Sequence, residues 1–518
     1  MSDAPITHPA KTSGNWRASA ALLWGSIECR LLAASDWLNP ILVKETRQAL
    51  KSWQFALTFV LLLVACWIVT IGGIAMIGPS VYYAAGGGEL LRAYYFILAF
   101  PLFVVVPFGA FRSLAAERED NTYDLLSITA LRPRQIIGGK LGSAIVQMAV
   151  YFSAITPCLA FTYLLRGVDV PTIALLLAYT SFASLALAMI GLLLATLTRQ
   201  RYHQVILSVA FIATLLVIFT TSQDIAEVLV RNAYIIIDQS QFWILNLAFG
   251  TSYATTFALA YLAAAAMITF ETESRSTPLR YAMLVQQAAL VGWGFGIWLY
   301  ANGPLEAVAT TIAIIAGIYW WGMGTMLTGE RPDMSQRVRR QLPQSVVGRV
   351  FLTWLQPGPR SGFMFATANL LSVVLICGVV VWLGLGGAGA VWMSPGDSTV
   401  ILVVGLSYVI AYLGMGCLVI AALRKVTIVT MFSGVLIHVL LLLAGSGIPT
   451  SVQLMSLQLR NNPYSLLQIT NPIWTIIYLL NYPGSAEAAV LVTAVSAAAV
   501  FALFLNIPAI VRELRRGR

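Results

Sequence analysis

Residues 54–77 read QFALTFVLLLVACWIVTIGGIAMI, a continuous apolar run without a charged side chain. A helix that crosses a bilayer needs about 20 such residues, because each residue adds about 1.5 Å along the helix axis. The run does not alternate between apolar and polar side chains, as a strand of a membrane barrel does. It therefore predicts a transmembrane helix.

Runs of the same kind recur along the chain. Of its 518 residues, 59% are hydrophobic and only 10% are charged, whereas a soluble domain carries about 25% charged residues. Twelve runs are long enough to cross a membrane, at 54–77, 92–112, 142–165, 172–197, 203–222, 243–268, 281–300, 305–327, 363–385, 399–423, 427–446 and 486–510. We therefore predict an all-α, polytopic transmembrane helical bundle of about 12 spans.

The positions of the basic residues predict the orientation. If both termini are cytoplasmic, the outer loops hold only four of the 31 basic residues, Arg92, Arg166, Arg231 and Arg460. This asymmetry follows the positive-inside rule. The net charge of +10 then reflects topology and contact with anionic lipids, and no nucleic-acid partner is expected. We predict a multi-pass protein of the cell inner membrane with both termini in the cytoplasm.

The loops divide the spans into two halves, which predicts a 6+6 parallel repeat of the kind found in many transporters. The longest inner loop follows the second span of each half, at 112–141 and at 328–362. We predict a cytoplasmic tail at 1–38, a permease-like six-span unit at 39–270 and a second, degenerate six-span unit at 271–518.

Two apolar segments on the predicted outer side are not counted as spans. Residues 464–480, YSLLQITNPIWTIIYLL, are short and broken at Asn471-Pro472, which predicts a re-entrant or interfacial segment. Residues 224–238 resemble a short, half-buried helix in the connection between the fifth and sixth spans.

A helix is predicted immediately before the first span. Asn39 is a good N-cap and Pro40 suits the first helical position. One side of this helix carries Leu42, Thr46, Ala49, Leu50 and Trp53, and the other carries Lys44, Gln48 and Lys51. This pattern is typical of a helix that lies in the membrane interface.

The segment 112–140, RSLAAEREDNTYDLLSITALRPRQIIGGK, carries most of the functional signal. The second span runs directly into Glu117, so its helix should continue into the cytoplasm. Asn121 can begin a short helix and Pro133 the next one. Between them lies an apolar patch made of Leu125, Leu126, Ile128 and Leu131. Such a patch suits docking into a groove of another protein, although resting on lipid head groups accounts for it equally well.

The pattern E-R-E-x-x-T-x-D-L-L-x-x-T-x-L-x-P-x-x-I-x-x-G-K in this segment resembles the cytoplasmic loop of type-2 ATP-binding-cassette (ABC) exporter permeases. The matching residues are Glu117, Arg118, Glu119, Thr122, Asp124, Leu125, Leu126, Thr129, Leu131, Pro133, Ile136, Gly139 and Lys140. In NPILVKETRQ, the residues Lys44, Glu45 and Arg47 resemble the interfacial helix that precedes the first span in the same family. The resemblance covers roughly residues 38–270.

The chain departs from the family pattern in places. Asn121 stands where the family usually has glycine, and Ala130 where it often has proline. In the second half, residues 328–343 contain Glu330 and Asp333 but no Leu-Leu patch. Either one chain supplies both ATPase contacts, or two chains pair as a homodimer or with a second permease.

The resemblance implies a membrane subunit of an exporter that is driven by a separate cytosolic ATPase. That partner would hold the loop around Leu125 and Leu126, and it would carry the ATP and magnesium. This sequence has no G-x-x-x-x-G-K-[ST] motif of its own, so it is not expected to bind ATP by a P-loop or to act as an enzyme. No cofactor bound directly by the chain and no metal site are expected.

Three other functions compete with that of an exporter subunit. A secondary transporter usually keeps ionisable residues near the bilayer midplane, and here only His438 is embedded in a predicted span. A membrane enzyme needs clustered acids, bases or metal ligands, whereas His8, His203 and His438 are far apart in the sequence. A membrane scaffold or assembly protein without transport stays open, because the second half lacks a good copy of the loop.

Overall fold

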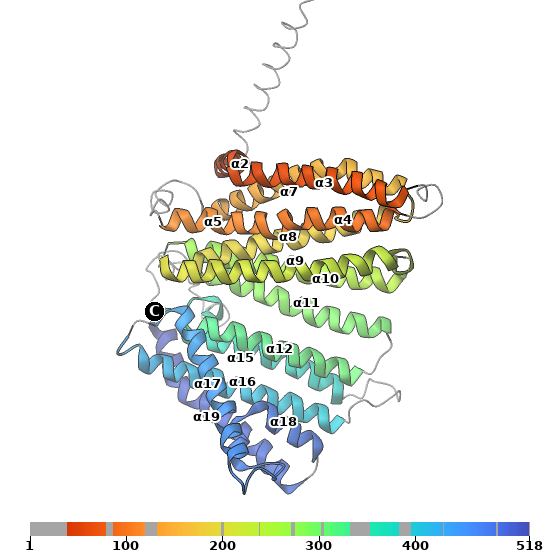
Figure 1. Cartoon of the computed structure of the whole chain (residues 1–518). Coiled ribbons are helices and arrows are strands. Elements are labelled where there is room, and N and C mark those ends of the chain that lie inside the picture. Colours follow the sequence, from red (N-terminus) through yellow and green to blue (C-terminus); the bar gives the residue numbers. More distant parts are fainter. Residues whose placement is uncertain are drawn as a thin grey trace, which may run out of the picture. The chain divides into compact units, whose positions relative to one another are not determined.

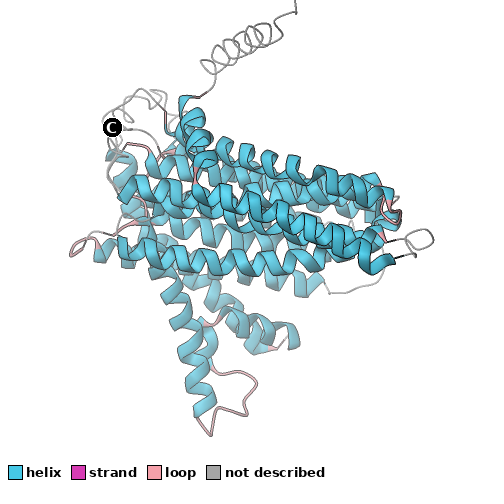
Figure 2. Cartoon of the chain, turned by 45° about the horizontal axis from the view of Figure 1, so that its top comes forward, coloured by secondary structure: helices cyan, strands magenta, loops and turns pink. Residues whose placement is uncertain are grey.

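The structure is a computed structural model of the chain. It describes residues 39–78, 86–119, 132–197, 201–237, 239–270, 275–301, 305–331, 353–382, 395–427, 429–482 and 485–516. These residues form helices joined by turns, with no strand among them (Figure 2).

Twelve of the described helices are long and apolar enough to cross a membrane, at Trp53–Met76, Gly87–Glu119, Pro133–Leu164, Val170–Leu197, Arg201–Asn232, Ser240–Ile268, Thr277–Tyr300, Leu305–Thr328, Pro359–Trp382, Asp397–Leu423, Met431–Met455 and Ala486–Glu513. Each contains one of the twelve predicted runs or most of it. The prediction of an all-α, polytopic membrane protein with about 12 spans is confirmed.

The chain divides into two compact units, Met1–Phe242 and Trp243–Arg518. The first unit contains α2 (Pro40–Lys51), α3 (Trp53–Ile77), α4 (Gly87–Phe100), η2 (Pro101–Val105), α5 (Val106–Glu119), α7 (Pro133–Leu164), α8 (Val170–Leu197) and α9 (Arg201–Ile237) (Figure 1). The helix α10 (Ser240–Ile268) begins at the boundary.

The second unit continues with α11 (Thr277–Ala301), α12 (Leu305–Thr328), η3 (Thr353–Leu355), α15 (Pro359–Trp382), α16 (Pro395–Leu423), α17 (Met431–Met455), η4 (Leu466–Thr470), α18 (Pro472–Asn481) and α19 (Ala486–Arg516). The division falls at the start of α10, whereas the loop pattern predicts a boundary after residue 270, at the end of this helix.

The second span is one continuous helical segment with a π-helical turn in its middle. In this turn the N–H of Val106 donates to Pro101 O, five residues back. The carbonyl oxygen of Leu102, which an α-helix would have paired with Val106, accepts instead from Ser184 Oγ of α8 at 2.6 Å. The turn is held because a neighbouring helix supplies the missing donor.

The predicted short helix at 224–238 is wrong as a separate element. The helix α9 runs without a break from Arg201 to Ile237 and includes most of that segment. Two of its charged residues are paired, since Glu227 lies 2.9 Å from Arg92 of α4 and 2.7 Å from Arg231, one turn later on α9. The polar residues therefore do not end the helix.

The segment 464–480 is not a span-length helix. It consists of η4 and the ten-residue helix α18, and the break falls at Asn471-Pro472 as the sequence predicts. The preceding span is longer than expected, because α17 continues to Met455 and contains Pro449.

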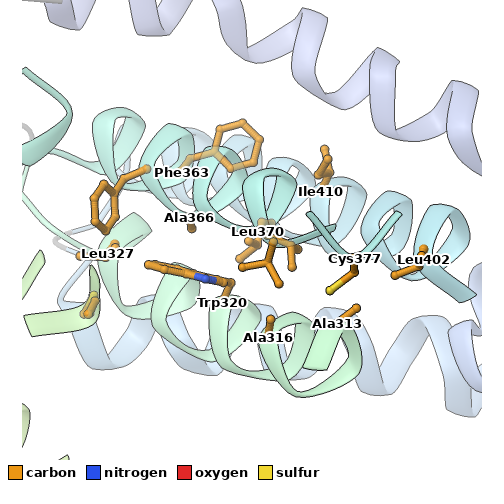
Figure 3. Close-up of a cluster of buried hydrophobic side chains, with 14 of the residues drawn as sticks. Ala313, Ala316, Trp320, Leu327, Phe363, Ala366, Leu370, Cys377, Leu402 and Ile410 are labelled. Carbon is orange, nitrogen blue, oxygen red and sulfur yellow. The ribbon is translucent and has the colours of Figure 1, made fainter. Parts of the chain in front are cut away.

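The core of the second unit lies where α12 packs on α15 and α16. Trp320 of α12 is fully buried and faces Phe363, Ala366 and Leu370 of α15 (Figure 3). Its ring meets that of Phe365 edge to face, with 5.5 Å between the ring centres. Its indole N–H donates to Gln287 Oε1 of α11 at 2.8 Å. A large aromatic side chain stabilises such a contact through the apolar area that it buries and through the edge-to-face geometry of its ring, and here its N–H also has a partner.

Candidate functional site

The helix α2 begins where the sequence predicts. The Asn39 side chain accepts from the N–H of Ile41 at 3.1 Å and caps the helix, and Pro40 is its first residue. The residues of α2 that are buried within the protein are not those of the predicted apolar side. Ile41 and the charged Glu45 are the buried residues of α2, whereas Trp53, just beyond its end, is 78% exposed.

This face of α2 packs closely on the first turns of α7. A Cβ atom added at Gly139 would lie 2.8 Å from Ile41 Cγ2, and one added at Gly142 would lie 2.7 Å from Leu42 Cδ1. The Asn39 amide also donates to Gln135 O of α7. Gly139 is therefore required for the close approach of the helices, since its Cβ would also lie 3.1 Å from the backbone nitrogen of Leu42, whereas at Gly142 the flexible end of the Leu42 side chain would have to move.

Four charged residues meet where α2, α5 and α7 come together. Lys140 of α7 lies 3.1 Å from Glu45 Oε1 of α2 and 3.0 Å from Glu117 Oε2 of α5. Lys44 of α2 lies 3.2 Å from Glu117 Oε1. We call these residues, Lys44, Glu45, Glu117 and Lys140, the Lys140 cluster.

The Lys140 cluster is charge-balanced and mostly buried. The side chains of Lys140, Glu45 and Glu117 are 1%, 8% and 13% exposed, while that of Lys44 is 54% exposed. The Lys140 ammonium also donates to the carbonyl oxygen of Ser113, at 3.3 Å. An ammonium group buried this deeply is stable only when it is paired and hydrogen-bonded. The cluster therefore ties three helices together, and it does so through charges that are costly to separate.

The two residues after Glu117 point to other helices, since successive residues of a helix are about 100° apart. Arg118 is buried and donates to the carbonyl oxygens of Ala195 and Thr196 at the end of α8. A cation at a helix C-terminus satisfies free carbonyl groups and interacts favourably with the helix dipole. Glu119 lies 2.8 Å from Arg201, the first residue of α9.

The end of α5 is thus joined to four other elements of the first unit by three consecutive side chains. Glu117 joins it to α2 and α7, Arg118 to α8 and Glu119 to α9. The extension of the second span past Glu117 was predicted from the sequence and is confirmed. The buried contacts of Glu117 and Arg118 hold this extension in the unit, whereas the exposed pair of Glu119 and Arg201 adds little.

The other residues that the sequence singles out are described by the structure only in part. Pro133 is the first residue of α7, as predicted, and the backbone N–H of Arg132 donates to Gln135 Oε1 at 2.9 Å to cap it. Arg47 of α2 is exposed and is not a member of the cluster. Thr122, Asp124, Leu125, Leu126, Thr129 and Leu131 lie outside the described residues.

The second unit contains a buried ionic network that the sequence analysis missed. Arg280 of α11 is fully buried, and its guanidinium lies 2.9 Å from Glu330 Oε2. Glu330, just after α12, also accepts from the Ser276 hydroxyl at 2.6 Å and the Gly358 N–H at 2.8 Å. Arg280 stands one residue before the predicted span 281–300, where a basic residue reads as an ordinary membrane-edge anchor.

The C-terminal helix joins the same region of the second unit. Glu513 of α19 accepts from the backbone N–H groups of Arg360 and Ser361, at 3.2 and 3.3 Å. Both donors belong to the first turn of α15, whose free N–H groups and helix dipole favour a carboxylate. Single charged residues in the sequence gave no signal for this pairing, because 152 residues separate Ser361 from Glu513.

Comparisons of the chain with protein-family models, curated proteins and solved structures found no match. The likeness to ABC exporter permeases therefore rests on the pattern at 117–140, on the helix before the first span and on the order of the spans.

Proposed function

We propose that this chain is the membrane-spanning permease subunit of an ATP-driven exporter, and that its segment 112–141 receives a separate cytosolic ABC-type ATPase. The observation that carries the proposal is the attachment of the end of α5. Three consecutive side chains join it to α2, α7, α8 and α9. The segment with the apolar patch leaves from this end and returns at Pro133, the start of α7.

The attachment explains how a contact at the segment would move the membrane helices. A force on the segment acts on α5 at one end and on α7 at the other, and the Lys140 cluster joins both to α2. Separating these helices would leave buried charges without partners, at a cost of about 3–5 kcal/mol for each broken pair. The three helices therefore move together when the ATPase closes on ATP.

In this proposal the partner binds ATP and magnesium, and the chain supplies the path through the membrane. The site lies on the cytoplasmic side of the inner membrane, where the positive-inside rule places the residues before the first span and after the second. The exported substrate crosses along spans that carry few charges, which suits an amphipathic molecule better than a free ion.

The test is a pull-down of the tagged, detergent-solubilised chain from its own cells, with Leu125→Asp/Leu126→Asp as the variant. Burying two carboxylates in an apolar groove costs several kcal/mol, so the variant should lose the partner. The control is Leu457→Asp, at an 89% exposed position far from the segment in the sequence. ATP hydrolysis and mass spectrometry identify what is recovered.

Recovery of an ABC-type ATPase with the wild type and with Leu457→Asp, but not with the double variant, would support the proposal and place the contact. If the wild type recovers no ATPase, the exporter function is contradicted, and a scaffold or a secondary carrier takes its place. If the double variant still recovers the ATPase, the docking segment is misplaced.

A further inference from the structure

A groove of about 460 Å³ lies between the last third of α17 and the segment that contains α18. Its volume falls in the range of roughly 300–1,000 Å³ that is usual for small-molecule sites. It is lined by Ser446, Gly447, Thr450, Ser451, Asn471, Ile473, Trp474 and Ile477. All of these residues belong to the second unit, and none belongs to the docking segment proposed above.

Pro449, inside α17, and Asn471, just before α18, hold the two walls of the groove together. Pro449 has no N–H, so the carbonyl oxygen of Gly445, four residues back, loses its helical donor. The hydroxyl of Thr470 donates to this oxygen at 2.7 Å. Asn471 then caps α18 by accepting from the N–H of Trp474 at 3.2 Å, and its amide donates to Thr450 Oγ1 at 3.1 Å. The two walls are thus held to each other.

Buried polar groups fix the segment behind the groove. Gln453 and Gln468 are almost fully buried, and the amide of Gln468 donates to Gln453 Oε1 at 2.9 Å. Tyr408 of α16 donates to Ile469 O at 2.6 Å. Satisfied buried networks of this kind make a segment rigid. The groove is therefore formed before any ligand arrives.

The two walls differ in chemistry. The α17 wall presents the hydroxyl groups of Ser446, Thr450 and Ser451. Those of Ser446 and Thr450 donate to the carbonyl oxygens of Leu442 and Ser446, each at 2.7 Å, so their oxygens face the groove as acceptors. The α18 wall presents Ile473 and Ile477, which are 69% and 52% exposed, with Trp474 between them. None of the lining residues carries a charge. One side of the groove thus suits an uncharged polar group, and the other suits a hydrocarbon chain.

The position of the groove along α17 places it at the edge of the bilayer. The 25 residues of α17 extend about 37 Å, which exceeds the roughly 30 Å of hydrocarbon in a bilayer. The groove occupies the end of this helix that lies beside stacked tyrosines. The ring centres of Tyr464 and Tyr478 are 4.5 Å apart, and those of Tyr478 and Tyr482 are 5.0 Å apart. Tyr478 is buried in the core of the second unit, whereas Tyr482 is 49% exposed, as is usual for a tyrosine ring where the membrane meets water.

We propose that this groove binds a membrane lipid whose head group is uncharged and carries hydroxyl groups, as in a glycosyl diacylglycerol. The hydroxyl groups of the head group donate to the Ser446 and Ser451 oxygens of α17, and an acyl chain lies along Ile473 and Ile477. A phosphate would bring a negative charge that no lining side chain balances. The site does not depend on an ATPase partner.

The test is native mass spectrometry of the purified full chain, in a polyoxyethylene detergent, titrated with glucosyl dioleoylglycerol. Gly447→Trp fills the groove without a backbone clash, because a Cβ atom there meets nothing within 4 Å. Gly378→Trp on α15 is the matched control, since its Cβ is equally unobstructed. The wild type and the control should bind the lipid alike. Gly447→Trp should weaken binding at least about tenfold, which is about 1.4 kcal/mol.

A second pair of variants keeps the test independent of how well Gly447→Trp folds. Ile477→Ser removes part of the apolar wall and should weaken binding, while Leu466→Ser, at a 77% exposed position that does not line the groove, should not. Equal lipid binding by all these proteins would overturn the proposal. Equally tight binding of dioleoylphosphatidylglycerol in the groove would contradict the inference that the preferred head group is uncharged. Full displacement of the lipid by methyl glucoside would overturn the role of the acyl chain.

Discussion

Replacement of Lys140 by methionine tests whether the first unit is held by balanced buried charges. Methionine keeps most of the volume of the lysine side chain but removes its charge. Within the cluster, Glu45 and Glu117 would then keep Lys44, which is 54% exposed, and the cluster would carry a net negative charge. We expect Lys140→Met to destabilise the first unit, and we expect the additional change Glu45→Gln to restore much of the loss.

The magnitude follows from burial. Lys140 is 1% exposed and lies 3.1 Å and 3.0 Å from its two carboxylates, and removing one partner of such a buried pair costs about 3–5 kcal/mol. The pair between Lys44 and Glu117 is partly exposed, so Lys44→Met should cost no more than about 1 kcal/mol. For a unit of this size, a loss of 3–5 kcal/mol lowers the melting temperature by roughly 6–20 °C.

The assay is thermal unfolding of the purified chain in detergent, followed by tryptophan fluorescence at one fixed heating rate, because membrane proteins often unfold irreversibly. The order of melting temperatures should be wild type, Lys44→Met, Lys140→Met/Glu45→Gln and Lys140→Met, from highest to lowest. If Lys140→Met melts no lower than Lys44→Met, or if Glu45→Gln restores nothing, the charge-balance reasoning is refuted.

Two further predictions concern packing and orientation. Gly139→Leu should destabilise the first unit by about 1–3 kcal/mol, because its Cβ would press on Ile41. The control is Gly109→Leu, whose Cβ meets nothing within 4 Å. Equal melting temperatures of the two variants would contradict the prediction. In intact cells a membrane-impermeant maleimide should label Leu457→Cys, which is 89% exposed, but should leave Lys51→Cys unlabelled until the cells are opened. The reverse pattern would show that the termini are outside.

The features that the sequence predicted well are those that depend on neighbouring residues. A run of apolar residues is enough to make a spanning helix, because the length requirement is set by the bilayer and the backbone bonds are internal. The cap at Asn39, the break at Asn471-Pro472 and the helical start at Pro133 follow from the same local chemistry. Lys44, Glu45, Glu117 and Lys140 were also singled out, although from two separate segments and without any sign that they meet.

The features that it missed depend on distant partners. The helix α9 continues through Glu227 because Arg92, 135 residues earlier, lies beside it. Glu45 lies inside the unit because Lys140, 95 residues later, lies opposite. Arg280 is buried for the same kind of reason, since its partner Glu330 is 50 residues away. A charge beside an apolar run reads as a membrane-edge residue until its partner is known.

In each unit a largely buried carboxylate lies at the end of a spanning helix, near the start of one of the two longest predicted inner loops. In the first unit this residue is Glu117, paired with Lys140, and in the second it is Glu330, paired with Arg280. Apolar side chains of the same size would often stabilise a fold as well as a buried ion pair does, or better. The benefit of such a pair is that it permits one arrangement and makes others costly. Under the proposed function, a force on the segment 112–141 would act on a unit that moves as one body, and a buried pair of this kind would serve that purpose.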